Sequence, residues 1–173
     1  MDMDIQCASR TLLTKLLQDF NCGSRQVIRA LTTSAHARYC TLPSPGRLEW
    51  QPMMILPKAS RSTAEHFQTV RRHSRPVEEV FGKVEQMEVL DQAALDLVFA
   101  GELNLGWDRF RRSYPESKGI VEVSCPGFSR DLAQAMIEIG ISLDRLFGFG
   151  ECCLYVREGQ RWTMVSRKET WAS

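Results

Sequence analysis

The clearest pattern of apolar and polar positions lies in the last third of the chain, where a helical stripe gives way to strands. The stripe consists of large apolar residues spaced four, three and four positions apart: Leu103, Trp107, Phe110 and Tyr114. This spacing predicts an amphipathic helix that Asn104 can cap and that Pro115 ends. Because an aromatic stripe of this kind packs against a core far more often than it binds a ligand, the helix is interpreted as a core element.

Short strands and tight turns are expected after this helix. Residues 120–125 predict a strand that is followed by the turn dipeptide Pro126-Gly127. Residues 152–157 and 161–165 flank the turn Glu158-Gly159 and predict a β-hairpin. The end of the chain is therefore expected to form part of a sheet.

Three segments give weaker patterns. Residues 132–141 fit both a helical and a strand template, and periodicity alone does not choose between them. Residues 25–33 are ambiguous, and their β-branched residues slightly favour a strand. Residues 83–99 have β character early and a run of Ala, Leu and Asp later. The elements of these segments stay open at this point.

Two further helices are predicted nearer the N-terminus. Residues 10–20 carry leucines at helical spacing, which indicates an amphipathic helix with one buried face. Ser62 and Glu65 have the spacing of a capping box, in which each side chain accepts from the backbone amide near the other residue. The box predicts a helix that runs to about Arg72.

A long loop is predicted over residues 41–60. Proline and glycine are too dense there for a regular element, at Pro43, Pro45, Gly46, Pro52 and Pro57. Trp50 and its apolar neighbours inside the loop indicate that part of it lies against the core. Loops of this length in a compact domain are often functional or mobile.

Together these elements predict one α+β domain over residues 1–173. We expect about three helices to cover one face of a mostly antiparallel sheet that ends in the C-terminal hairpin, with residues 107–173 forming the helix and sheet core. The candidate core residues are the large apolar side chains of these elements: Trp107, Phe110, Tyr114, Phe128, Ile137, Ile139, Leu154, Val156, Trp162 and Val165.

Composition and charge indicate an ordinary soluble protein. Of the 173 residues, 43% are apolar and 25% are charged, and the net charge of +1 gives no bulk reason to expect binding to nucleic acid or an anionic membrane. No apolar stretch approaches the roughly 18 residues of a transmembrane helix. The first residues lack the features of a signal peptide, and Asp2, Asp4 and Asp19 argue against a mitochondrial presequence. We expect a cytoplasmic protein that does not bind membranes.

Charge is nevertheless distributed unevenly along the chain. Residues 61–75 hold four arginines and one acid, whereas residues 76–102 hold seven acids and one lysine. The preferred interpretation is that these two blocks pair with each other across the fold. The alternative is a dipolar surface that steers a charged partner, with Arg71-Arg72 and Arg111-Arg112 at its positive ends.

The six cysteines favour burial over metal binding or a disulfide framework. No pair has the CxxC spacing of a zinc or redox site, and the three histidines lie far from any cysteine in the sequence. Cysteines in a reducing compartment behave as small buried apolar residues. We therefore expect no metal and no cofactor. Cys152 and Cys153 lie on a predicted strand, so their side chains should point to opposite faces.

The C-terminal part of the chain resembles a group of small, uncharacterised bacterial proteins. The shared pattern reads W..F...YP.S.GI...S..GF, then an apolar strand, then L.G.G and a final hairpin that ends in TW.S. It covers residues 107–173, from Trp107 through Tyr114-Pro115 to Thr170-Trp171. The resemblance implies no activity or ligand. It does imply a strand over 132–141, because the corresponding segment of those proteins looks like a sheet strand.

This chain departs from the pattern at two places. Those proteins often carry a C-G-G-L-C-G type of turn, which would be compatible with a disulfide in an exported protein, where this chain has residues 143–148 without cysteine. An arginine expected after Ser124 is Cys125 here. Both departures weaken an argument for export and for a site built on that arginine.

No catalytic motif is present that would identify a reaction. The sequence lacks a GxSxG elbow, an HExxH helix, a Walker A loop and a GxGxxG fingerprint. The preferred function is a non-catalytic binding module for a protein or a small ligand. A hydrolase-like enzyme with a diffuse site is one alternative, in which Ser124 or Cys125 would lie near His66 or His73. A weak nucleic-acid binder that uses the arginine clusters is the other.

The candidate binding residues come from three places: the predicted loop 41–60, the arginine-rich segment 61–75 and the end of the predicted strand 120–125. They are Trp50, His66, Arg71, Arg72, His73, Ser124 and Cys125.

Overall fold

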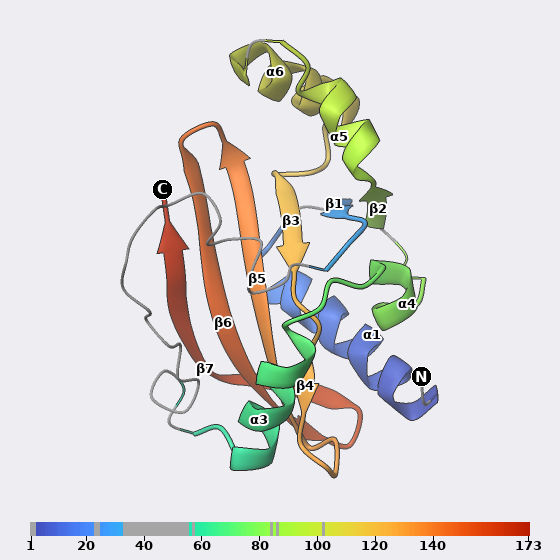
Figure 1. Ribbon diagram of the computed structural model, residues 1–173, viewed down its shortest axis with the longest axis vertical. Helices are drawn as coiled ribbons and strands as arrows, with labels where there is room; N and C mark the ends of the chain where they lie inside the picture. The colour runs from blue at the N-terminus through green and yellow to red at the C-terminus, as the bar shows by residue number, and fades with distance from the viewer. Residues whose placement is uncertain are drawn as a thin grey trace.

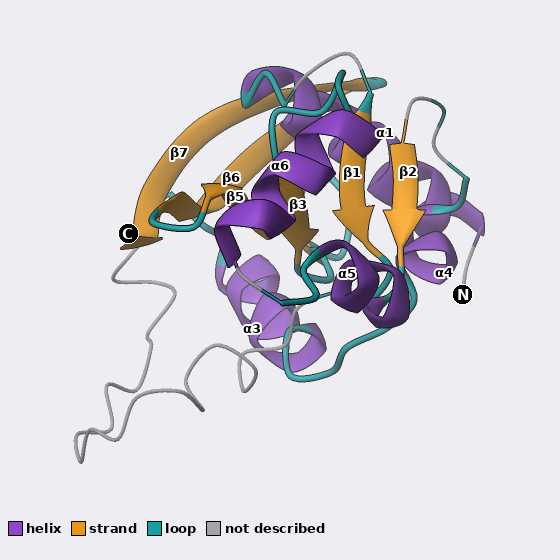
Figure 2. Ribbon diagram, turned by 90° about the horizontal axis from the view of Figure 1, so that it is seen from above, coloured by secondary structure: helices purple, strands orange, loops and turns teal. Residues whose placement is uncertain are grey.

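A computed structural model describes most of the chain, and the described residues form one mixed sheet with helices on both faces (Figures 1 and 2). The described ranges are 3–22, 25–32, 56, 58–83, 85, 87–101 and 103–173. The elements in chain order are α1 (Met3–Asp19), β1 (Gln26–Arg29), α3 (Arg61–Val70), α4 (Val77–Phe81), β2 (Met87–Leu90), α5 (Gln92–Val98), α6 (Leu103–Ser113), β3 (Ile120–Val123), β4 (Gly127–Phe128), β5 (Gln134–Asp144), β6 (Phe147–Glu158) and β7 (Arg161–Ala172).

The seven-stranded sheet has the order β2-β1-β3-β5-β6-β7, and the short strand β4 pairs with β5 beside this path. The pairs β3/β5, β5/β6 and β6/β7 are antiparallel, which confirms the prediction of a mostly antiparallel sheet. Strands β2 and β3 instead run parallel to β1, so the sheet is mixed. Helices connect β1 to β2 and β2 to β3, and a helical crossover is the usual connection between parallel strands.

The helices cover both faces of the sheet, which corrects the expectation of about three helices on one face. Five helices lie in the described ranges. The buried residues of α1 and α4 join the largest hydrophobic cluster, together with Ile28, Val121 and Cys153. Residues next to these in the sequence point to the other face, where α5 and α6 cover Val27 and Ile120 while α3 covers Cys152. Because strand side chains alternate, each face has its own apolar set that needs covering.

Two buried polar contacts anchor α1 to the C-terminal hairpin. The hydroxyl of Tyr155 donates to Oδ2 of Asp19 at 3.0 Å, and Nε1 of Trp162 donates to Oγ1 of Thr11 at 3.1 Å. Large aromatic side chains can be buried this deeply because their polar atoms find partners.

Several predicted elements are confirmed. Strand β1 lies within 25–33. The segment 83–99, whose elements were left open, contains β2 followed by α5. The segment 132–141 lies within β5 apart from its first two residues. The C-terminal hairpin is present with Gly159 in its turn at φ +60°, a backbone conformation that glycine adopts without steric cost. The helix predicted over 10–20 is also present, and it begins earlier, at Met3.

Three local predictions are wrong. The cap of α3 is Ser60 and not Ser62, because the Ser60 side chain accepts from Thr63 N and fixes the start of the helix at Arg61. Asn104 lies inside α6, which begins at Leu103, and therefore does not cap it. The dipeptide Pro126-Gly127 is not a turn, because Gly127 belongs to β4 and pairs with β5.

The predicted core residues are mostly buried. Seven of them are buried, namely Trp107, Phe110, Phe128, Ile137, Ile139, Leu154 and Trp162. Tyr114, Val156 and Val165 are partly exposed. Most of the predicted loop 41–60 lies outside the described residues. Within the described part of the chain, no helix is long and apolar enough to cross a lipid bilayer.

Candidate functional site

The predicted site residues that the structure describes lie on three segments, namely α3, the residues that follow it and the residues that follow β3. His66 lies on α3, Arg71 caps the C-terminal end of that helix, and Arg72 and His73 follow it with exposed side chains. Trp50 lies outside the described residues. The roles of these residues as a binding site therefore stay predictions.

Ser124 is buried and has a structural role between β3 and β5. Its backbone N donates to Glu138 O at 2.9 Å, and its Oγ accepts from Glu138 N at 2.9 Å while donating to the carbonyl of Cys125 at 3.2 Å. The hydroxyl thus already both donates and accepts within the sheet. Neither of these bonds joins Ser124 Oγ to a histidine, which is the base that a serine nucleophile would need.

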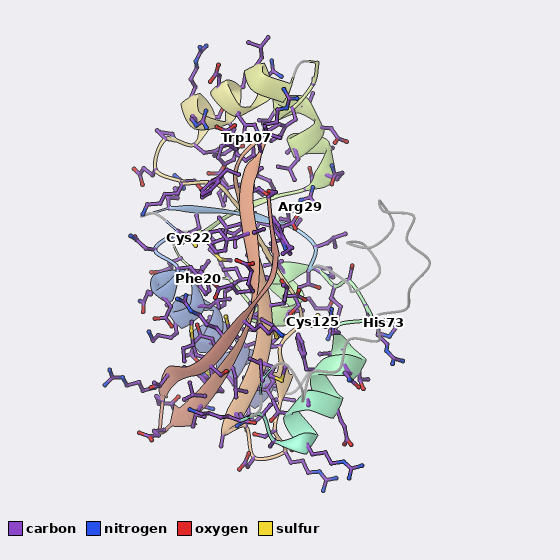
Figure 3. The ribbon with its side chains drawn as sticks, turned by 90° about the vertical axis from the view of Figure 1, so that its left-hand side faces the viewer. Phe20, Cys22, Arg29, His73, Trp107 and Cys125 are labelled. Atoms are coloured by element: carbon purple, nitrogen blue, oxygen red, sulfur yellow. The ribbon has the colours of Figure 1, made fainter. Side chains whose placement is uncertain are left out.

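Cys125 is buried on the α1 face of the sheet, with its Sγ 3.3 Å from Thr32 Oγ1. Burial raises the pKa of the Cys125 thiol, and the hydrogen bond with Thr32 offsets only part of this increase. A raised pKa lowers the population of the nucleophilic thiolate at neutral pH. The contact with His73 involves only that residue's carbonyl, and the His73 side chain points away from Cys125 (Figure 3).

The other described cysteines agree with the interpretation of buried apolar residues, apart from the exposed Cys7. Burial raises the pKa of Cys22 to about 11 and also raises the pKa values of Cys152 and Cys153. Cys152 and Cys153 belong to different hydrophobic clusters on opposite faces of the sheet, as the alternation of a strand predicts. Among the described residues, no cluster of His, Cys, Asp or Glu could hold a metal ion.

The two arginine clusters lie on separate parts of the molecule. Arg71 and Arg72 lie at the C-terminal end of α3, beside the middle of β5, whereas Arg111 and Arg112 lie on α6 at one end of the sheet (Figure 1). Arg111 also forms ion pairs with Asp108 and Asp144. These arginines therefore do not share the single face that a nucleic-acid surface would need.

One groove does collect polar side chains from separate elements. It runs between the N-terminal half of α3 and the segment 129–133, which connects β4 to β5. The groove consists of two adjoining cavities of about 370 and 460 Å³ that share Ser62, Ser129 and Arg130 as walls. His66 lines the first cavity and Ser60 the second, and we call the two cavities together the α3 groove.

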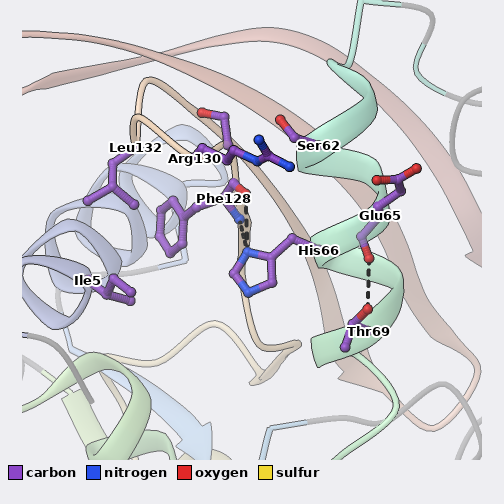
Figure 4. A pocket seen from close by; sticks show the side chains of 9 residues that line it. Ile5, Ser62, Glu65, His66, Thr69, Phe128, Arg130 and Leu132 are labelled. Atoms are coloured by element: carbon purple, nitrogen blue, oxygen red, sulfur yellow. Dashed lines mark hydrogen bonds between the residues drawn. The ribbon is translucent and has the colours of Figure 1, made fainter.

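His66 joins α3 to β4 through one ring nitrogen (Figure 4). Its Nδ1 lies 2.9 Å from the backbone N of Phe128 and 3.1 Å from the carbonyl O of the same residue. The hydrogen bond next to Phe128 in the ladder of β4 and β5 runs from Ser129 N to Gln134 O. The backbone N and O of Phe128 therefore point away from β5 and face α3. The other ring nitrogen, Nε2, has no hydrogen-bond partner among the described residues.

Close packing of a glycine makes this contact possible. A Cβ atom added to Gly127 would lie only 2.3 Å from the Cα of Phe67, the residue next to His66. Strand β4 therefore approaches the backbone of α3 closely because residue 127 has no side chain. This approach brings the backbone of Phe128 within reach of the imidazole.

Gln134 fixes the start of α3 against the sheet. Its Oε1 accepts from Ser60 N at 2.6 Å, and its Nε2 donates to Lys58 O at 3.2 Å. One amide side chain on β5 thereby holds the backbone on both sides of residue 59. The N-terminal end of α3 is placed at the groove as a result.

Arg130 is the exposed basic side chain in the groove wall. It follows Ser129, whose Oγ donates to Asp131 Oδ1 at 2.6 Å and thereby helps to form the turn. The guanidinium of Arg130 has no ion-pair partner among the described residues. The sequence alone did not single out Arg130, because its only signal there is its position in the polar stretch between Phe128 and the next strand.

Two carboxylates border the groove, and both already have partners. Glu65 Oε1 accepts from Arg61 Nε at 2.7 Å in an exposed ion pair. Hydrogen bonds from the Ser129 hydroxyl and from the backbone N of Ala133 lower the pKa of Asp131, which therefore stays ionised. Among the described residues of the wall, Arg130 and Asp131 are therefore the charged side chains outside an ion pair.

Comparison of the chain with models of known protein families, with curated proteins and with solved structures found no match.

Proposed function

We propose that this protein is a non-catalytic binding module whose α3 groove takes a small ligand with an anionic group. The observation that carries the proposal is that Arg130 and His66 line the same cavity. Arg130 has no ion-pair partner among the described residues, so its charge is available to a ligand. A carboxylate or a phosphate is the group that a guanidinium binds best.

The hydrogen bonds of His66 favour a donor at Nε2. A buried backbone N–H without a partner is rarer and more costly than an under-satisfied carbonyl, so Phe128 N is expected to donate to Nδ1. A neutral imidazole that accepts at Nδ1 carries its proton on Nε2. The protonated ring also carries a proton on Nε2. His66 therefore offers an N–H to an anionic ligand in both states.

The N-terminal end of α3 adds an electrostatic field that favours an anion in the second cavity. The first helical bond is donated by Ala64 N to Ser60 O, so the amides of Arg61 and Ser62 precede it. The positive end of a ten-residue helix attracts anions. The hydroxyls of Ser60 and Ser62 lie at the same end and can donate to ligand oxygens.

The same geometry gives less support to a hydrolase. A general base must accept a proton from the nucleophile, whereas the favoured tautomer of His66 carries its proton on Nε2. The two nucleophiles considered from the sequence, Ser124 and Cys125, are buried. Binding without chemistry is thus the function that the groove supports best.

The proposal is tested by calorimetric titration with hexanoate and with hexyl phosphate at pH 7.5. We expect saturable binding of at least one probe, and the better probe identifies carboxylate or phosphate as the preferred group. Arg130→Gln should weaken binding at least about tenfold, because it removes a charge-assisted hydrogen bond. Arg112→Gln makes the same charge change on α6 and should leave binding unchanged.

Two results would contradict the proposal. The first is the absence of saturable binding of both probes. The second is equal affinity of the wild type and Arg130→Gln, which would place any binding elsewhere on the chain.

A further inference from the structure

The first cavity of the α3 groove has an apolar side as well as a polar side. Ile5 from α1, Phe128 from β4 and Leu132 from the connection to β5 line it opposite the polar residues of α3. Figure 4 shows these three side chains on the α1 side, with Ser62 and Glu65 across the cavity and His66 between. A ligand that fills the cavity therefore meets an anion-binding wall and an apolar wall.

Leu132 holds an unusual backbone conformation at this wall. Its φ of 57° lies in the left-handed region, which glycine and asparagine adopt at lower cost than leucine. Local hydrogen bonds hold the turn, since Leu132 N donates to Ser129 O at 3.0 Å and Ala133 N donates to Asp131 Oδ1 at 3.1 Å. A branched apolar side chain is thus held at a turn position that small or polar residues fit better.

We infer that Leu132 is a specificity-determining residue and that the ligand of the α3 groove carries a short apolar portion next to its anionic group. This inference rests on the proposed function. The anionic group lies at Arg130 and Nε2 of His66, and the apolar portion lies on Ile5, Phe128 and Leu132. Charge complementarity with Arg130 orients the ligand, and the apolar wall selects its length.

The test is a series of straight-chain carboxylates, in which only the apolar portion changes. Acetate, butyrate and hexanoate are titrated by nuclear magnetic resonance at pH 7.5, where all three are ionised. A fully buried methylene group strengthens binding about fourfold, and the open cavity should yield about twofold for each. Hexanoate has four more methylene groups than acetate, so we expect it to bind about sixteenfold more tightly on this basis.

Two variants assign the chain-length effect to Leu132. Leu132→Asn suits the left-handed backbone and removes the apolar surface, so its affinities for acetate and hexanoate should differ by less than about threefold. Leu132→Met keeps an apolar side chain of similar volume and should keep the wild-type gradient. Thermal unfolding of both variants shows whether each is folded at the temperature of the titration.

The outcomes separate this inference from the proposed function. Equal affinity for all three carboxylates in the wild type overturns the inference and leaves anion binding standing. If affinity increases with chain length in Leu132→Asn as steeply as in the wild type, the proposed role of Leu132 is overturned. Failure of every carboxylate and of hexyl phosphate to bind overturns the proposed function itself.

Discussion

Arg71 and Glu138 form a buried ion pair between the end of α3 and the middle of β5. The Nη2 and Oε2 atoms lie 3.6 Å apart, and the side chains are only 8% and 9% exposed. The guanidinium also lies 5.4 Å from the centre of the Phe67 ring. Arg71, a predicted ligand-binding residue, therefore joins a helix to the sheet.

The first prediction concerns this pair. Glu138→Gln should lower the free energy of unfolding by about 3 kcal/mol, because it removes one of the two charges of a buried ion pair. Urea denaturation followed by tryptophan fluorescence measures the change. Arg71→Met combined with Glu138→Leu should cost less than the sum of the two single changes, since neither charge then remains buried.

A control for this prediction is Glu65→Gln, which breaks the exposed pair of Arg61 and Glu65. Exposed pairs contribute little to stability, so the urea midpoint should not move. Equal losses of stability in Glu65→Gln and Glu138→Gln would show that burial does not increase the contribution of the pair of Arg71 and Glu138 to stability.

Strand alternation and the Glu158-Gly159 hairpin turn could be predicted from the sequence, because both depend on neighbouring residues. Cys152 and Cys153 show this, since their predicted opposite orientation is the observed one. The parallel pairing of β1 was not readable. Its partners are four-residue strands far away in the chain, and short apolar runs carry no signal of direction.

The groove was harder to predict than the sheet, because it depends on contacts between distant segments. Ser60 and Ser62 both precede a helical pattern, and the hydrogen bond from Ser60 N to Gln134, 74 residues away, helps to place the N-cap of α3 at Ser60. Arg130 becomes a candidate only when its turn is seen beside α3. Of the residues predicted for binding, His66 lines the groove.

The second prediction concerns the close approach of β4 to α3. Gly127→Ala should lower the free energy of unfolding by about 2 kcal/mol, because the new methyl group would meet the backbone of Phe67. Gly159→Asn is the control, since its turn has open space and asparagine tolerates a positive φ. Chemical denaturation of both variants makes the comparison, and equal stability of Gly127→Ala and the wild type would refute the close contact.

The third prediction concerns stability at alkaline pH. Burial raises the pKa of Tyr155 above its ordinary value of 10.0, and the nearby Cys153 and Asp19 raise it further. The unfolded protein releases this proton first, so the stabilisation is complete below about pH 10 and is lost as the pH rises above that value. The free energy of unfolding should therefore fall between pH 9 and 11.

Tyr155→Phe isolates this contribution. The variant should be less stable at pH 8 by about 1 kcal/mol, because it loses the hydrogen bond to Asp19. It should lose less stability than the wild type between pH 9 and 11. The remaining loss reflects the buried thiols of Cys152 and Cys153, whose pKa values are also raised. Identical alkaline profiles for the two proteins would be incompatible with the prediction.

The fourth prediction separates the two ring nitrogens of His66. In His66→Asn the amide can occupy the place of Nδ1 and keep a hydrogen bond with Phe128, but nothing replaces Nε2 in the groove. In His66→Gln the longer amide can reach the place of Nε2 and loses the contact with β4. We expect His66→Asn to keep near wild-type stability and to bind hexanoate several-fold more weakly than the wild type.

We expect His66→Gln to bind hexanoate nearly as well as the wild type does. This variant should be less stable by about 1 to 2 kcal/mol, because Phe128 N loses its partner. Urea denaturation and calorimetric titration of both variants measure the two effects separately. If stability and affinity fall together in each variant, Nδ1 and Nε2 do not have separate roles, and His66 contributes to the groove only by holding β4 against α3.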